Sequence, residues 1–300
     1  MSSVTVRVPA KVNLQLSVGG PRSDGYHDVA TVFHAVSLFD DVTALPGDHL
    51  TVSVEGEGAE VVPVDDSNLA LVAARALAEH TGTEAKAHLH VHKSIPVSGG
   101  MAGGSADAAG ALVALDKLWD TRVDRDELQA IAATVGSDVP FALMGHTAVG
   151  LGRGERLTPA LARGRFHWVF AFAQSGLSTP AVYAELDRLR TGSVQAEPRI
   201  SDALMAALRS GDAVSLGRTL SNDMQRAAVS LAPDLAMTMD VGDEYGALGA
   251  VICGSGPTCA FLARDDEHAL DLAVALTASG TCRSVKTVTG PAAGARVVTA

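Results

Sequence analysis

The sequence predicts an α+β protein of two lobes. Strand-like and helix-like patterns occur in both halves of the 300 residues, and no period of about 20 to 50 residues indicates a repeat protein. Residues 157–165 are polar and interrupted by glycine, and a new strand-like run begins at His167. We therefore expect an N-terminal lobe over 1–160 and a C-terminal lobe over 161–300, with the site in the cleft between them.

The composition excludes several classes of protein. With 47% hydrophobic and 19% charged residues, the chain has too much apolar surface to remain disordered. Its 23 basic and 34 acidic residues give a net charge of −11 without a basic stripe, so we expect no nucleic-acid partner. Apolar runs end well before the roughly 20 residues of a membrane span, and no signal-like segment opens the chain.

The cysteines indicate a reducing compartment. The chain has 3 of them, Cys253, Cys259 and Cys282, an odd number without a CxxC pair. Such a set fits neither a disulfide framework nor a zinc site. We expect a cytoplasmic protein, and the sequence carries no signal for its oligomeric state.

The first half begins with strand signals. Residues 4–8 alternate β-branched and polar side chains up to Pro9, which predicts a strand that runs into a turn. Further strand-like runs lie at 29–36 and 50–54. Apolar residues at helical spacing then predict a helix over 67–80, capped by Asp66 or Ser67.

A strand, a glycine-rich loop and a helix follow one another. Residues 87–92 alternate with a period of two, which predicts a half-buried strand ending at Ile95-Pro96. The loop over 98–105 contains four glycines and leads into a helix over 106–119. Its backbone N–H groups and the positive end of the helix favour a phosphate group, although a glycine cluster can also serve tight packing. The loop matches neither the Walker A pattern nor GxGxxG.

The remaining elements are predicted by spacing and capping signals. A helix over 124–135 stops at Gly136, followed by a compact loop over 136–140. In the second half we expect strands near Val169 and Val251. We also expect helices over 181–190, 202–209 and 267–278, and a second glycine turn over 253–257.

Lys11 and Asp138 are candidate catalytic residues when they are considered with the glycine loop. A lysine after a strand is usually a surface residue, and an aspartate in a loop is usually a turn or cap residue. Phosphoryl transfer, however, asks the protein mainly for positioning and for positive charge near the transferred group. A lysine and an aspartate can together hold and activate an alcohol.

Five segments together resemble the GHMP kinases, in the order of that family. The resemblance runs from residue 9 to about 260, and its most specific part is the pair of segments 9–14 (PAKVNL) and 24–27 (DGYH). The other segments are 96–109, 136–141 (GSDVPF) and 254–257 (GSGP). The resemblance implies an N-terminal lobe like the second domain of ribosomal protein S5 and a ferredoxin-like C-terminal lobe.

The resemblance also implies an activity. We expect an enzyme that uses ATP and Mg²⁺ to phosphorylate a small alcohol carrying a cytidine diphosphate group. Two alternatives remain, namely a mevalonate or homoserine type of kinase and a non-catalytic, ligand-sensing relative. The retention of Lys11 and Asp138 is the sequence feature that argues against the second alternative.

Individual roles follow from the positions that match the family. Asp138 would accept or orient the proton of the substrate hydroxyl, and Lys11 would keep that carboxylate ionised, with Asn13 beside them. Asn68 and Lys93 match positions on the adenine side. The ATP phosphates would be wrapped by Pro96, Val97, Ser98, Gly99, Gly100, Met101, Ala102, Gly103, Gly104, Ser105 and Ala106.

The resemblance places the substrate on other residues. Tyr26 would stack on cytosine, His27 would bind the edge of the base, and Tyr183 would close the stack, with Thr179 in the same segment. Gly254, Ser255 and Gly256 would form a backbone wall near the rest of the substrate.

The sequence departs from the family at the start of the helix after the glycine loop. Many members have two serines and an asparagine where this chain has Ser105, Ala106 and Asp107. Ser105 is therefore the candidate hydroxyl for magnesium. Asp107 suits the positive end of the helix but would repel a phosphate, so it either lies outside the path of the anion or acts behind a magnesium ion.

Two other patterns have a simpler explanation than function. His88, His90 and His92 share a strand face, but we interpret them as solvent-facing residues rather than as a metal site. The acidic pairs at 40–41, 65–66 and 265–266 are interpreted as turn and cap residues.

Overall fold

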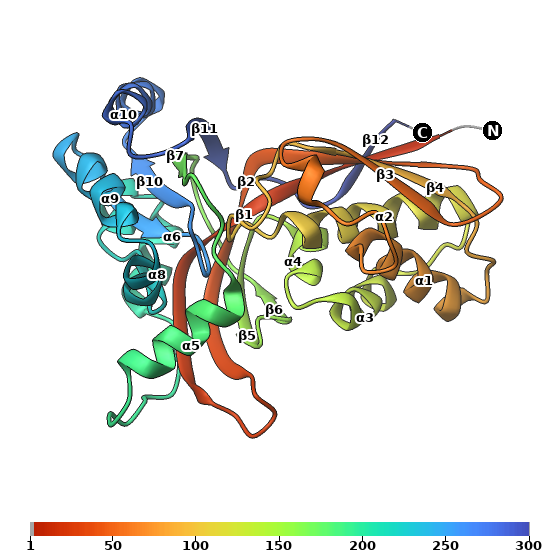
Figure 1. Cartoon of the computed structure of the whole chain (residues 1–300), viewed down its shortest axis with the longest axis horizontal. Coiled ribbons are helices and arrows are strands. Elements are labelled where there is room, and N and C mark those ends of the chain that lie inside the picture. The colour runs from red at the N-terminus through yellow and green to blue at the C-terminus, as the bar shows by residue number, and fades with distance from the viewer. Residues whose placement is uncertain (1–2, 300) are drawn as a thin grey trace.

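The computed structural model describes residues 3–299, which form two sheets connected by one long hairpin. β1 (Val4–Pro21) and β2 (His27–Leu45) pair antiparallel along almost their whole length. Figure 1 shows this hairpin in red and orange, crossing from the N-terminal helices to the C-terminal half, where its tip lies near α5 (Thr179–Leu189). The hairpin therefore carries residues of both lobes.

The first sheet has eight strands, and its main path has the order β12-β1-β2-β4-β3. β5 pairs with β2 and β6, and β8 pairs parallel with β1. The further strands are β3 (Thr51–Gly56), β4 (His88–Lys93), β5 (Thr147–Gly152), β6 (Arg156–Pro159), β8 (Ser221–Asn222) and β12 (Arg296–Thr299). The helices of this lobe are α1 (Leu69–Thr81), α2 (Gly103–Trp119), α3 (Arg125–Val135), α4 (Val139–Met144) and the short 3₁₀ helix η1 (Ala59–Val61).

The second sheet has four antiparallel strands in the order β11-β7-β10-β9. In chain order this is fourth, first, third, second, with helices between the first and second strands and between the third and fourth, as in ferredoxin-like folds. Its strands are β7 (Phe166–Phe172), β9 (Gly249–Ile252), β10 (Cys259–Ala263) and β11 (Ser284–Gly290). The helices besides α5 are α6 (Asp202–Ser210), α7 (Ala213–Gly217), α8 (Gln225–Leu231), α9 (Asp234–Glu244) and α10 (Asp266–Ser279). The predicted two-lobed α+β fold is confirmed.

The expected turn at Pro9 is wrong, because β1 continues through this residue to Pro21. The register between β1 and β2 shifts between Pro9 and Ala10, so the proline lies at a bulge. A bulge leaves one residue outside the regular hydrogen-bond ladder, and it is one of the few places where a sheet accepts a residue without an N–H. Lys11 consequently lies in the middle of a strand and not at its end.

The predicted cap of the first helix is also wrong by one or two residues. α1 begins at Leu69, and the Oδ1 of Asn68 accepts a hydrogen bond of 2.9 Å from the N–H of Ala70. Asp65 instead accepts from the N–H and the hydroxyl of Ser67, which makes the turn before the helix. The helix at 124–135 behaves as expected, since the side chain of Asp124 accepts from Glu127 N–H.

The division of the chain at residue 160 stays a prediction. β12 returns from the end of the chain to pair with β1, and β8 adds to the same sheet from within the second half. The start of β1 and the last strand, β12, accordingly lie side by side in Figure 1. Within residues 3–299, no helix is both long and apolar enough to cross a bilayer.

Candidate active site

The structure brings Lys11 and Asp138 together, although they are 127 positions apart in the chain. The Nζ of Lys11 lies 4.0 Å from the Oδ2 of Asp138. It donates hydrogen bonds of 2.7 Å to the Oδ1 of Asn13 and 2.8 Å to the carbonyl of Gly100. Lys11 is 5% exposed, so its ammonium depends on these neighbours in place of water.

Asp138 is held by the start of α4 but does not cap it. It occupies the N-cap position, and its side chain makes no hydrogen bond to the helix. Pro140 in the first turn also removes one N–H that a cap would otherwise satisfy. The carboxylate therefore faces Lys11 on one side, while 31% of its side chain stays exposed on the other. This exposure leaves room for an acceptor hydroxyl.

A short hydrogen-bond chain orients Asn13. Its Nδ2 donates to the hydroxyl of Thr31 at 2.8 Å, and that hydroxyl donates to the carbonyl of Gln15 at 2.7 Å. Because the amide nitrogen is engaged there, the amide oxygen points to Lys11. Thr31 was not identified from the sequence, and nothing in its local pattern distinguishes it from other strand threonines.

The glycine loop touches the second glycine turn at Gly100. Its φ of +74° suits glycine, and a Cβ added here would lie 1.9 Å from the carbonyl oxygen of Cys253. Ser98 and Ala102 also have positive φ, 54° and 62°, although they carry side chains. This backbone is strained for L-residues, and such strain persists only where the surrounding structure enforces it.

The second glycine turn also lies against Lys11. A Cβ on Gly254 would be 3.1 Å from the Nζ of Lys11 and 3.1 Å from the carbonyl of Gly100. The Nδ2 of Asn222 holds this turn by donating to the carbonyls of Ile252 and Gly254, both at 2.7 Å. Asn222, in β8, is a further site residue that sequence reasoning missed, because only the parallel pairing of β8 with β1 brings it here.

The other residues of the second turn connect to α5. The hydroxyls of Thr179 and Ser255 are 2.9 Å apart. Gly256 lies farther around the turn, where an added Cβ would meet the side chains of Ile252 and Leu177. Within the predicted wall at 254–256, Gly254 therefore lies against Lys11, and Ser255 lies against α5.

A buried cluster of charges lies beneath the glycine loop. The Nζ of Lys93 donates to Asp40 at 2.6 Å and to Asp107 at 2.7 Å, and all three side chains are buried. Asp40 also accepts from the N–H groups of Ser94 and Ile95, at 2.6 and 2.8 Å. The interpretation of residues 40–41 as turn residues is wrong, since both lie within β2, where Asp41 pairs with Arg7.

The cluster shifts the pKa values of Asp107 and Lys93. Burial raises the pKa of Asp107 to about 7. The charge of Lys93 opposes this shift, and the like charge of Asp40 adds to it. Burial alone would lower the pKa of Lys93. The attraction of its ammonium to Asp107 and Asp40 outweighs this effect, so the pKa of Lys93 is raised. Lys93 thus stays charged, while burial disfavours the charged form of Asp107.

Asn68 and Lys93 are both engaged inside the protein. The Nδ2 of Asn68 donates to the carbonyl of Pro63 at 2.7 Å, while its oxygen caps α1. Lys93 is 3% exposed and paired with two carboxylates. Their expected contact with adenine stays a prediction. In this conformation their visible effect is to fix the start of α1 and the base of the glycine loop.

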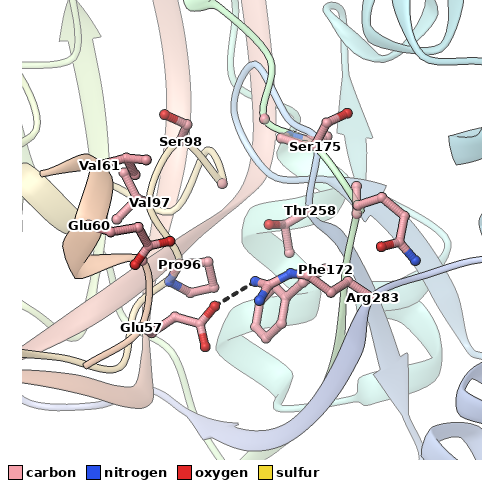
Figure 2. Close-up of a pocket in the computed structure, with 16 residues that line it drawn as sticks. Glu57, Glu60, Val61, Pro96, Val97, Ser98, Phe172, Ser175, Thr258 and Arg283 are labelled. Atoms are coloured by element: carbon pink, nitrogen blue, oxygen red, sulfur yellow. Dashed lines mark hydrogen bonds and ion pairs between the residues drawn. The ribbon is translucent and has the colours of Figure 1, made fainter.

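A pocket of about 330 Å³ opens between the two lobes beside the glycine loop. Figure 2 shows the loop residues Pro96, Val97 and Ser98 on one side, with Phe172 and Thr258 of the C-terminal lobe opposite. Gly99 also lines it. Across its mouth, Arg283 donates a hydrogen bond of 2.6 Å to Glu57. Its lining combines apolar side chains such as Val97 and Phe172 with polar ones such as Thr258, which suits a flat heteroaromatic group.

The first turn of α2 fits a magnesium ion held mainly by phosphate oxygens. Mg²⁺ prefers hard oxygen donors and is usually bound by few protein groups together with phosphates. Ser105 is half-buried in this turn, and the Oδ1 of Asp107 is a buried acceptor without a hydrogen-bond partner among residues 3–299. In the same residues, no group of three His, Cys, Asp or Glu side chains could hold a metal.

Three residues predicted to bind the base are distributed differently from the expected stack. His27 and Tyr183 stack on one another, with ring centroids 4.8 Å apart and an angle of 28°. Tyr26 is 54% exposed, and the guanidinium of Arg153 lies 5.1 Å from the centre of its ring. Burial, with a smaller contribution from the charge of Asp138, raises the pKa of Tyr183 to about 12, so the phenol stays protonated.

The three histidines of β4 lie against β3. His88 contacts the hydroxyls of Thr51 and Ser53, and His90 contacts that of Ser53. His92 is exposed, as expected, whereas His88 and His90 are half-buried.

Two family models match the chain. The model of the GHMP kinases N terminal domain matches residues 68–146, and that of the GHMP kinases C terminal domain matches residues 204–282. The first match includes the glycine loop and Asp138.

Several relatives match this chain over almost its whole length and are identical to it at more than half of the positions. A relative from Streptomyces avermitilis is 57% identical, covering 99% of this chain and 100% of the relative. One from Mycolicibacterium smegmatis is 56% identical, covering 99% and 93%. Both are named 4-diphosphocytidyl-2-C-methyl-D-erythritol kinase. A crystal structure of 4-(cytidine 5'-diphospho)-2C-methyl-D-erythritol kinase is 33% identical, with a TM-score of 0.76, covering 95% of this chain and 98% of that chain.

Proposed function

This chain belongs to the GHMP kinases, and we propose on this premise that it phosphorylates the 2-hydroxyl of 4-diphosphocytidyl-2-C-methyl-D-erythritol. It is a kinase that takes its phosphate from ATP, and the products are the 2-phosphate and ADP. The reaction belongs to the non-mevalonate route to isoprenoid precursors. Identity of 57% over the full length with a relative of that name supports the substrate, and the 4.0 Å approach of Lys11 to Asp138 supports the chemistry.

Asp138 is proposed to receive the acceptor hydroxyl. Its carboxylate is partly exposed, so an alcohol can donate a hydrogen bond to it while the oxygen attacks the γ-phosphorus of ATP. Because phosphoryl transfer passes through a loose transition state, orientation of the alcohol matters more than early removal of its proton. The transfer is direct and in line, with no covalent intermediate on the protein.

Lys11 is proposed to supply positive charge at the point of transfer. Its ammonium is already held by Asn13 and the carbonyl of Gly100, so it needs little reorganisation when the phosphate arrives. A charge held in place within a buried site stabilises developing negative charge better than a mobile one in water. The same ammonium lies 4.0 Å from the carboxylate of Asp138, so both groups can act on one acceptor hydroxyl.

The glycine loop is proposed to bind the triphosphate of ATP, with the adenine end in the pocket beside it. Residues 96–106 lead into the first turn of α2, whose N–H groups favour an anion. Mg²⁺, when bound, neutralises phosphate charge, and Ser105 would hold it. The expected contacts of Asn68 and Lys93 with adenine are part of this proposal.

The cytidine end of the substrate is proposed to lie at the tip of the long hairpin. Tyr26 and Tyr183 would stack on the base, and His27 would bind its edge. Thr179, Ser255 and Gly254 would line the path from there to Lys11, a role that the contact between the two hydroxyls and the approach of Gly254 to Lys11 support. The compartment is proposed to be the cytoplasm, in accord with three cysteines that are all free thiols.

A substrate panel tests this function. The purified protein is given ATP and Mg²⁺ with the cytidyl alcohol, with mevalonate and with homoserine, and ADP release is followed together with the phosphorylated product. We expect turnover of the cytidyl alcohol alone. Preferred turnover of homoserine or mevalonate would refute the substrate, and no turnover with any alcohol would indicate a ligand-sensing relative.

A further inference from the structure

One helix holds the imidazole of His27 by its face and by its edge. Tyr183 and Asp187 are four positions apart in α5, so their side chains project from the same side of the helix. Tyr183 stacks on the ring of His27, and the Oδ1 of Asp187 lies 2.9 Å from its Nε2. The stack fixes the plane of the ring, and the hydrogen bond fixes its rotation within that plane.

The partner of Nε2 determines where the proton of the neutral imidazole lies. An ionised carboxylate can only accept hydrogen bonds, so the Nε2 of His27 must donate to Asp187. A neutral imidazole carries one N–H, and its Nδ1 is then an acceptor. The second nitrogen of such a histidine therefore offers a lone pair and no proton.

The Nδ1 of His27 is open to a ligand. Within residues 3–299 it makes no hydrogen bond, and the buried side-chain atoms without a partner are those of His34, Asp107 and Trp168. Nδ1 is not among them, so it reaches solvent although His27 as a whole is 8% exposed. The position lies at the end of the site where the base is proposed to bind.

The pyrimidine bases present opposite groups to such an acceptor. Cytosine carries an exocyclic amine that donates hydrogen bonds, whereas uracil has a carbonyl oxygen at the same position. An acceptor nitrogen would bind the amine and face the carbonyl with lone pair against lone pair. We propose that Asp187 is a positioning residue that holds His27 with its proton on Nε2, and that it thereby selects cytosine over uracil. The inference rests on the proposed cytidyl substrate.

The kinetic test compares two substrates in three proteins. kcat/KM is measured for the cytidyl alcohol and for its uridyl counterpart in wild type, in Asp187→Asn and in Glu185→Gln. An asparagine can either accept from or donate to Nε2, so it no longer specifies the position of the proton. The control removes a carboxylate from the same helix that contacts Arg188 and Ser230 instead of His27.

We expect wild type and Glu185→Gln to prefer the cytidyl alcohol strongly. In Asp187→Asn the ratio of the two kcat/KM values should fall by about tenfold or more, because the unpaired polar group no longer penalises the wrong base. An equal loss for both substrates indicates a merely structural role and overturns the proposal, as does an unchanged ratio. An inactive wild type would refute the proposed function itself, whereas these outcomes in an active enzyme concern only Asp187.

A spectroscopic measurement tests the proton directly, without turnover. ¹⁵N-labelled histidine is incorporated, and the signals of His27 are assigned by their loss in His27→Gln. In wild type, Nε2 should carry the proton and Nδ1 should have the shift of an unprotonated ring nitrogen. A proton on Nδ1 of the neutral ring would overturn the proposal even if Asp187→Asn failed to fold.

Discussion

Lys93 and Asp107 form a buried ion pair of 2.7 Å where the glycine loop becomes α2. The same ammonium reaches Asp40, which binds the N–H groups of Ser94 and Ile95 where the loop begins. One lysine therefore connects both ends of the loop. Two carboxylates share this single buried cation, which makes the charge of Asp107 costly.

Asp107→Asn should make the free energy of unfolding less dependent on pH. The pKa of Asp107 is about 7 in the folded protein, against about 3.9 in an unfolded chain. Between these values the folded state binds more protons, so wild-type stability falls as pH rises. Asp107→Asn lacks this loss, so its free energy of unfolding should rise relative to that of wild type between about pH 4 and pH 7.

Urea unfolding across this range measures the effect, and Asp126→Asn is the matched control. Asp126 is an exposed carboxylate in the first turn of α3. Its variant should differ from wild type by a nearly constant amount over the same range. Parallel profiles for wild type and Asp107→Asn would show that Asp107 titrates normally and contradict the prediction.

Lys11→Met and Asp138→Asn should each lower kcat by about 100- to 1000-fold, because each removes a preorganised group from the point of transfer. KM for both substrates should change only a few-fold. The double variant should lose little more than either single one, because the two groups act as a unit. Steady-state kinetics with Lys86→Met, an exposed lysine, as control checks this, and an Asp138→Asn enzyme with normal kcat would remove Asp138 from the mechanism.

Gly100→Ala should weaken both folding and ATP binding. A Cβ there would overlap the carbonyl of Cys253, and the positive φ adds roughly 1–3 kcal/mol of strain. Gly82→Ala is the control, because Gly82 has a similar φ and nothing within 4 Å of its Cβ position. The stability lost by Gly100→Ala beyond that of Gly82→Ala measures the contact between the two glycine turns, and equal losses would argue against it.

Tyr26→Ala and Tyr183→Ala should distinguish a tyrosine that serves only substrate binding from one that also stabilises the fold. Tyr26 is exposed, so its loss should leave the melting temperature unchanged while KM for the cytidyl alcohol rises about 5- to 100-fold and kcat falls less. Tyr183 packs on His27, so its loss should lower both affinity and melting temperature. A normal KM in Tyr26→Ala would exclude Tyr26 from base binding.

Local patterns in the sequence predicted those parts of the fold that depend on neighbouring residues. The alternation at 87–92 identified β4, and Asp124 identified the start of α3. The strand through Pro9 was missed, because a proline signals a break unless one knows that the partner strand shifts register there. β12 was missed for a related reason, since its pairing with β1 joins the two ends of the chain.

The residues of the candidate site also divide into those that the sequence identifies and those that only their spatial contacts reveal. Lys11, Asp138 and the glycine loop were identified from segments that resemble a family, and the structure brings them together. Asp40 was misinterpreted as a turn residue, because its burial depends on Lys93, 53 positions away. Asn222 and Asp187 gave no local signal, since their importance comes entirely from what they contact in space.

The long β1–β2 hairpin carries Lys11 in its first strand and His27 at the start of its second. The separation between the ammonium and the imidazole is set by strand register, so it stays constant whatever the rest of the two lobes does. The hairpin thus sets the distance between the two ends of the proposed substrate site. An alcohol whose spacer to the base is shortened by one phosphate would bind at one end only and leave its hydroxyl out of reach of transfer.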